Sequence, residues 1–132
     1  MLYVYTRVHS DNLHPFTQTL AISSYVSAPG RGHLKRLSTQ VYHEVVAGAG
    51  AVPLSGRKLN LLLSRLCPGD YLIVADLFVL DRQVDTLQQI LAAIRDREAT
   101  LLIASSYEMS QYPPQLLPAL QAVLPKTPSP QL

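Results

Sequence analysis

The sequence is poor in cysteine, tryptophan and charged residues. Cys67 is the only cysteine among 132 residues, which excludes an internal disulfide and fits a reducing compartment. Tryptophan is absent, charged residues make up only 15%, and the net charge of +2 is too small to indicate nucleic-acid binding by itself. Apolar residues nevertheless reach 48%, so we expect a globular chain that buries a core of its own.

Long hydrophobic runs are also missing. The longest apolar stretch, residues 71–80, is interrupted by Asp76 and is too short to span a membrane. No basic segment followed by an apolar one marks a secretory signal at the N-terminus. His14, His33 and His43 lack the spacing of metal ligands. We therefore expect a cytoplasmic protein with no metal, no cofactor and no membrane partner.

The pattern of apolar residues predicts alternating strands and helices. Strands are predicted at residues 1–8, 39–46, 71–74 and 100–104, and helices at residues 16–26, 57–66 and 82–97. A basic loop, residues 29–38, and a small flexible loop, residues 47–56, lie between them. This order predicts an α/β fold with a mainly parallel sheet of four to five strands and helices on both faces.

The prolines after residue 111 predict a change in organisation. Six of them fall between Pro113 and Pro130, and proline breaks a helix at its interior positions. We therefore expect residues 1–110 to form the α/β domain. Residues 111–132 are expected to form a proline-rich C-terminal tail with at most one short helix, near residues 115–124.

Several residues form a pattern that is found in a known family. Tyr5, Arg7 and Val8 lie at the end of the first predicted strand and Gln18 on the first helix, while Glu44 ends the second strand and Arg57 opens a leucine-rich helix. Residues 69–104 continue with GDYLIVADLFVLDRQVDTLQQILAAIRDREATLLIA. The chain resembles the N-terminal catalytic domain of resolvase/invertase-type serine recombinases over residues 2–105. The resemblance implies the family's α/β fold and a DNA phosphate as the group its arginines contact.

The residues that would carry the family's chemistry differ. His9 stands at the position of the nucleophilic serine, and Ser10 follows one residue later. An ungapped alignment places Phe78 and Val79 where the family has aspartate and arginine, and keeps only the last arginine, as Arg82. The triplet Leu80-Asp81-Arg82 could match instead only through a three-residue insertion, which we expect to disrupt a buried strand and its register.

These differences predict the loss of recombinase activity. Phosphoryl transfer to a serine develops negative charge that several converging arginines must stabilise, and removing one such donor costs about 2.7–4 kcal/mol. A nucleophile shifted by one residue also faces the opposite side of the strand. We therefore predict a catalytically inactive, resolvase-like module that regulates DNA transactions through protein contacts, with itself, a recombinase or another DNA-transaction protein as partner. DNA binding by this chain alone is expected to be weak.

Two other hypotheses stay open. The first is a divergent serine recombinase with Ser10 or His9 as nucleophile, although Ser10 could equally cap a turn and His9 could be an exposed polar residue. The second is a phosphate- or nucleotide-binding module in which Arg7, Arg57 and Arg82 form the anion site, supported by Tyr5, Gln18 and Glu44. The same arginines could instead be scattered or held in salt bridges.

Overall fold

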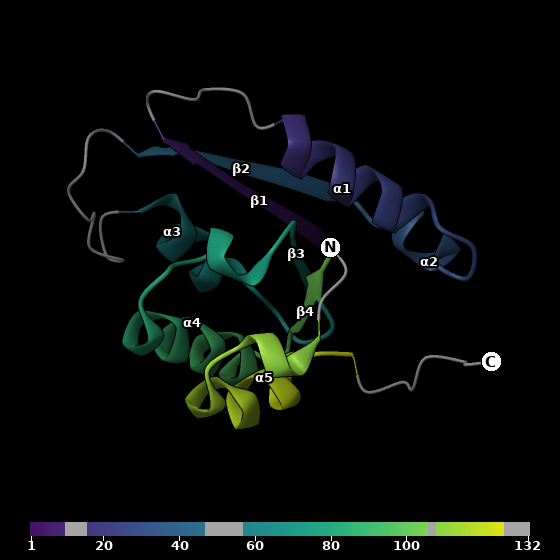
Figure 1. Cartoon of the computed structure of the whole chain (residues 1–132). Helices are drawn as coiled ribbons and strands as arrows, with labels where there is room; N and C mark the ends of the chain where they lie inside the picture. Colours follow the sequence, from purple (N-terminus) through teal and green to yellow (C-terminus); the bar gives the residue numbers. More distant parts are fainter. Residues whose placement is uncertain (10–15, 47–56, 106–107, 126–132) are drawn as a thin grey trace.

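The fold is an α/β structure built on one parallel sheet of four strands (Figure 1). The computed structural model describes residues 1–9, 16–46, 57–105 and 108–125. Its strands are β1 (Leu2–His9), β2 (Thr39–Val46), β3 (Tyr71–Val74) and β4 (Thr100–Ile103). Its α-helices are α1 (Phe16–Ser27), α2 (Gly32–Lys35), α3 (Lys58–Arg65), α4 (Val84–Asp96) and α5 (Leu117–Val123). The predicted fold class is confirmed.

The order of the strands determines where a site can form. The order is β2-β1-β3-β4, with β1 and β3 in the middle, and all described pairs are parallel. The chain therefore goes from β1 to β2 on one side of it, and then to β3 and β4 on the other side. Ligands of such sheets bind beyond the carboxyl ends of the two strands at which the order reverses.

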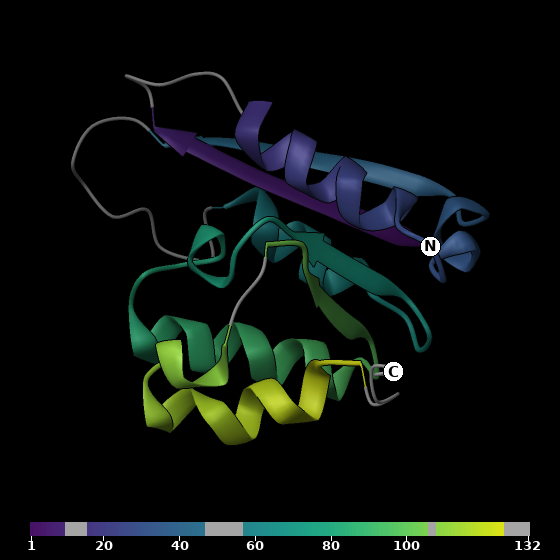
Figure 2. The same ribbon diagram turned by 45° about the vertical axis from the view of Figure 1, so that its right-hand side comes forward.

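Helices cover both faces of the sheet, as Figure 2 shows, with α1 on one face and α4 and α5 on the other. The smaller core lies under α1 and α2, and the larger one lies under α3, α4 and α5. In α4 the buried residues Leu87, Ile90, Leu91 and Ile94 recur at helical spacing and form one apolar stripe. Because both faces of the sheet are covered, the central strand β3 is almost continuously apolar and buried.

Two segments differ from the sequence-based expectation. Residues 32–35, expected within a basic loop, form the short helix α2, whose Leu34 is only 2% exposed and packs in the smaller core. The segment after residue 110 was expected to be a tail. Instead, its residues Tyr112, Leu116, Leu120 and Val123 are buried in the larger core. Up to residue 125 this segment belongs to the domain, and α5 is its one short α-helix.

None of the helices in the described ranges is long and apolar enough to cross a membrane.

Candidate functional site

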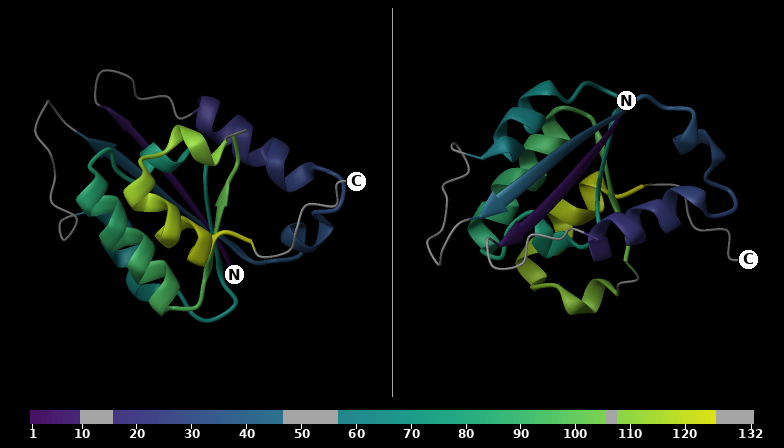
Figure 3. Two further views of the ribbon diagram at one scale, coloured as in Figure 1. Left: turned by 60° about the horizontal axis from the view of Figure 1, so that its bottom comes forward. Right: turned by 90° about the horizontal axis from the view of Figure 1, so that it is seen from above.

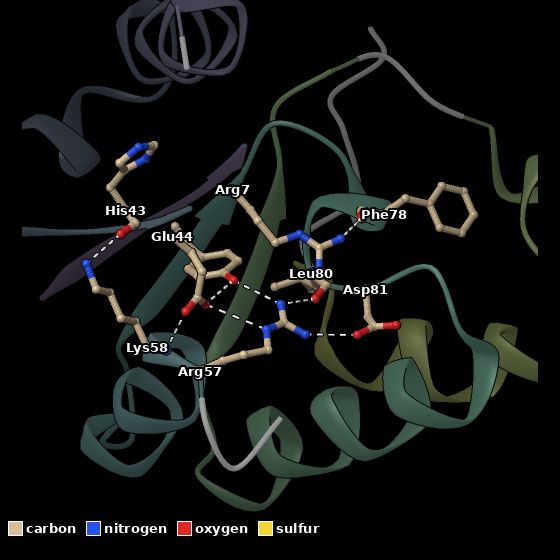
Figure 4. Close-up of polar contacts among 9 residues, drawn as sticks. Arg7, His43, Glu44, Arg57, Lys58, Phe78, Leu80 and Asp81 are labelled. Atoms are coloured by element: carbon tan, nitrogen blue, oxygen red, sulfur yellow. Dashed lines mark hydrogen bonds and ion pairs between the residues drawn. The ribbon is translucent and has the colours of Figure 1, made fainter. Parts of the chain in front are cut away.

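Five of the predicted site residues, Tyr5, Arg7, Gln18, Glu44 and Arg57, gather near the carboxyl ends of β1 and β2, beside the segment that follows β3. Tyr3, Tyr5 and Arg7 alternate toward the face that carries α3 and α4, and Arg7 is paired in register with Glu44 of β2. Arg57 lies immediately before α3, and Leu80 and Asp81 lie between β3 and α4. Figure 4 shows side chains from all these elements pointing toward one another.

Arg57 is the centre of a buried polar network. Its side chain is only 1% exposed, and its Nε lies 3.6 Å from Glu44 Oε1. Nη1 donates a hydrogen bond to Asp81 Oδ2 at 2.8 Å. Nη2 donates to the Tyr5 hydroxyl at 2.9 Å and to the Leu80 carbonyl. Two carboxylates therefore balance the charge of the guanidinium, and both of its Nη atoms donate to groups of the protein, while the buried Nε has no hydrogen-bond partner within the described residues.

Glu44 joins the network to β2 and α3. Its Oε1 accepts a hydrogen bond from the Tyr5 hydroxyl at 2.7 Å, and its Oε2 accepts one from the main-chain N–H of Lys58 at 2.8 Å. Burial by itself would raise the pKa of this carboxyl. The two hydrogen bonds and the positive charge of Arg57 outweigh burial and hold the pKa of Glu44 below its usual range.

Tyr5 is held in its neutral form by the same contacts. Burial, followed by the hydrogen bond to the Glu44 carboxylate, raises the pKa of the Tyr5 hydroxyl well above its ordinary value. A tyrosine of this kind does not become a phenolate nucleophile near neutral pH. Its hydroxyl is instead a bridge, because it donates to Glu44 and accepts from Arg57.

The Arg7 side chain donates fewer hydrogen bonds than Arg57 does among the described residues. Its Nη2 donates to the Phe78 carbonyl at 3.2 Å, and within the described part of the chain no carboxylate forms an ion pair with it. Burial, followed by the positive charge of Arg57, lowers the pKa of Arg7. An anion bound at this position would stabilise the positive charge of Arg7, which is half-buried and lies beside another cation.

Gln18 positions Arg7 through its main chain. Strand β3 pairs with β1 only from Leu2 to Val4, so the main-chain groups of Arg7 extend beyond the end of β3. The Gln18 side chain supplies the hydrogen bonds that a neighbouring strand would make there. Its Oε1 accepts from the Arg7 N–H at 3.1 Å, and its Nε2 donates to the Arg7 carbonyl at 2.7 Å. This pair of bonds satisfies polar groups of β1 and ties α1 to the site.

Of the remaining predicted residues, Arg82 is the one that the structure places near this network. Arg82 is exposed, and its positive charge is one of those that lower the pKa of Arg7, so these two cations lie near each other. His9 ends β1, whereas its side chain and Ser10 fall outside the described residues. No group of metal-ligating side chains occurs among the residues whose positions are described.

Asp81 is the site residue that the sequence interpretation missed. An insertion before Leu80-Asp81-Arg82 was expected to disrupt a buried strand, but β3 ends at Val74. Residues Leu77–Val79 form a 3₁₀ helix, and Asp76 accepts a hydrogen bond from the Phe78 N–H at its start. An insertion before Leu80 would therefore fall in a turn and not in the buried strand, so the expected damage to the strand does not argue against that alignment. The acidic residue after an apolar run was the available signal.

No known protein-family model matches the chain, and a search of curated proteins finds no relative of it.

Proposed function

We propose that the chain is a non-catalytic, resolvase-like module that takes part in DNA transactions through contacts with another protein. The observation that carries the proposal is the enclosure of Arg57, whose side chain is 1% exposed and whose Nη atoms donate to Asp81, Tyr5 and Leu80. An arginine that stabilises a transition state must offer its donors to the reacting phosphate. Arg57 instead connects four segments of the fold.

The turn after β3 supports the same proposal. Under the ungapped resemblance, Phe78 and Val79 replace an aspartate and an arginine. If the three-residue insertion is allowed instead, Asp81 and Arg82 take these positions, and Asp81 is then the carboxylate that binds Arg57. The Phe78 ring packs edge-on against Tyr112 with 5.8 Å between ring centroids, and both Phe78 and Val79 lie against the larger core. Apolar side chains in this packing supply neither charge nor hydrogen bonds to a phosphate. The chain's resemblance to a recombinase therefore concerns its architecture rather than its chemistry.

We expect no covalent protein–DNA adduct when the chain is incubated with supercoiled plasmid and the reaction is quenched with detergent. The measurement is a gel shift of the labelled protein, with Ser10→Ala and His9→Ala as comparisons. Both variants should behave as the unchanged chain does. An adduct formed by the unchanged chain and abolished in either variant would identify a nucleophile and overturn the proposal.

Anion binding is a second candidate function, and Arg7 is the observation that favours it. Its guanidinium lies at the carboxyl end of β1, beside Arg57 and Arg82, with one donor bound to the Phe78 carbonyl. Phosphate is the simplest ligand that such an arginine binds, through paired N–H donors. DNA, a nucleotide or a phosphorylated segment could each supply it.

Inorganic phosphate is expected to raise the free energy of unfolding, by about 2.7 kcal/mol at one hundred times its dissociation constant. Arg7→Ala should abolish this increase, and Arg82→Ala should weaken it. Arg95→Ala, which removes an exposed arginine of α4, should leave it unchanged. The measurement is urea unfolding in phosphate and in chloride at equal ionic strength. An increase that survives in Arg7→Ala would exclude this site.

A further inference from the structure

The outer edge of β2 carries main-chain groups, on alternate residues, that do not bond to β1. The Leu2 N–H donates to the Ser38 carbonyl, and β1 and β2 are paired in register from Leu2 and Thr39 onward. In a parallel pair this fixes which residues of β2 bond to β1: the even-numbered ones. The N–H and C=O groups of Thr39, Val41, His43 and Val45 therefore face away from the sheet, because β2 is the last strand on its side.

One contact shows this orientation directly. The Lys58 ammonium of α3 donates to the His43 carbonyl at 2.9 Å (Figure 4), as only an outward-facing carbonyl allows. A lysine placed over an exposed strand edge is a device by which proteins limit pairing with the edge strands of other chains. Lys58 is exposed, so its side chain can leave the carbonyl when a better partner arrives.

The two faces beside this edge differ in chemistry. On the face that carries α1, Val41 is 65% exposed and Val45 is 50% exposed, and in the right-hand view of Figure 3 α1 does not extend over β2. On the opposite face, Lys58 and Arg65 of α3 reach β2: Lys58 bonds to His43, and Arg65 Nη1 donates to the Tyr42 hydroxyl at 2.7 Å. The first face thus presents two exposed valines on either side of His43, whose ring is hydrogen-bonded to Thr6 at 2.8 Å, and the second presents two cations.

We propose that the outer edge of β2 binds an extended segment of a partner protein by strand addition, and that this segment alternates β-branched and acidic residues. Side chains of a strand alternate between faces, so the apolar ones would lie beside Val41 and Val45 and the acidic ones beside Lys58 and Arg65. The two cations are seven residues apart on α3, about 10 Å along the helix axis. Carboxylates two or four residues apart in a strand are about 7 or 13 Å apart, one value on each side of that spacing, so the flexible lysine and arginine side chains would adjust to reach them.

Charge favours this occupant over a second copy of the chain. Two β2 edges paired about a two-fold axis would bring the lysines and arginines of both copies together. The acidic residue of β2, Glu44, is only 9% exposed and already accepts bonds from Tyr5 and Lys58, so it cannot neutralise them. An acidic segment instead gives Lys58 a carboxylate in exchange for the His43 carbonyl, while main-chain bonds supply affinity.

The partner class deepens the proposed function, since it rests on the chain being a protein-binding module. The test uses a labelled peptide, acetyl-Val-Glu-Val-Glu-Val-Glu-Val-amide, measured by fluorescence anisotropy. Lys58→Ala and Arg65→Ala should each weaken binding about two- to five-fold, as expected for exposed ion pairs. The matched control Arg95→Ala should leave binding unchanged, and a peptide with lysine in place of glutamate should bind at least ten-fold more weakly.

Two further measurements separate strand addition from nonspecific attraction. Methylating the peptide nitrogens of one alternate set of residues should abolish binding, whereas methylating the other set should leave it. Bound peptide should slow hydrogen exchange of the Val41, His43 and Val45 amides at least ten-fold and leave Gln40, Tyr42 and Glu44 unchanged. Equal sensitivity to both methylated sets, or unchanged exchange at the odd-numbered amides, would overturn the site. Concentration-dependent protection without peptide would overturn it too, in favour of a second copy.

These outcomes are independent of the DNA assay. Peptide binding together with a covalent DNA adduct would overturn the non-catalytic role alone. Absence of both would overturn the strand-addition site alone.

Discussion

An Arg57→Met variant is expected to lose about 3–5 kcal/mol of the free energy of unfolding, the typical cost of removing one partner from a buried ion pair. Methionine approximates the apolar stem of arginine but lacks the guanidinium and therefore every donor. Glu44 and Asp81 would then face each other across the vacated position without their cation. The loss arises from these uncompensated carboxylates rather than from the value of the arginine's own contacts.

The measurement is urea unfolding at pH 7, compared with a matched variant on the surface. Arg95→Met removes an arginine that is 57% exposed and pairs with Asp96 at 3.0 Å, and it should cost about 1 kcal/mol or less. If Arg57→Met does not fold, Tyr5→Phe tests the same network through two bonds to charged groups and should cost about 1.5–3 kcal/mol. An Arg57→Met cost no larger than that of Arg95→Met would contradict the central role of Arg57.

The network also explains why distant parts of the sequence contribute to one site. Arg57 connects β1 through Tyr5, β2 through Glu44 and the segment before α4 through Leu80 and Asp81. A shift in the register of β1 or β2 would break these connections, because the buried charge of Arg57 would lose its partners. Buried polar groups can specify one arrangement in this way even where an apolar core would be equally stable.

The strands could be predicted from sequence because each has a local signal. The apolar run Tyr71–Val74 and the β-rich segment Thr39–Val46 have the predicted bounds, and α4 differs only at its ends. The segment after residue 110 could not be predicted in the same way. Prolines do exclude a long helix, but Pro114 and Pro118 lie in the first turns of short helices, where proline is tolerated. Burial of Tyr112 and Leu116 against the core is a tertiary property.

Most residues of the polar network could be predicted from the sequence, but Asp81 and the role of each residue could not. Tyr5, Arg7, Gln18, Glu44 and Arg57 were all singled out, and the structure brings them together. Sequence spacing could not distinguish Arg57 from Arg7, since both are arginines near strand or helix ends. Their difference depends on which carboxylates lie within reach, and that depends on Asp81, which the 3₁₀ helix Leu77–Val79 delivers to Arg57.

A Glu44→Gln variant is expected to be less stable than the unchanged chain by about 1.5–3 kcal/mol at pH 7, because hydrogen bonds to a charged group are lost. The folded-state pKa of Glu44 is held below its usual range, so the stability that its charge contributes is fully present above the pKa of the unfolded chain. That contribution is lost as the pH falls through the folded-state pKa. The difference between the two proteins should therefore be largest near neutral pH and shrink in acid.

The measurement is the free energy of unfolding by urea from pH 7 down to pH 3, with Glu98→Gln as the matched control. Glu98 is exposed, so its variant should follow the unchanged chain at every pH. As Glu44 takes up its proton, the free energy of unfolding of the unchanged chain should fall toward that of Glu44→Gln, because a protonated glutamic acid no longer balances the charge of Arg57. A difference that stays constant down to pH 3, or that grows in acid, would show that the charge of Glu44 does not stabilise the network and that Asp81 alone balances Arg57.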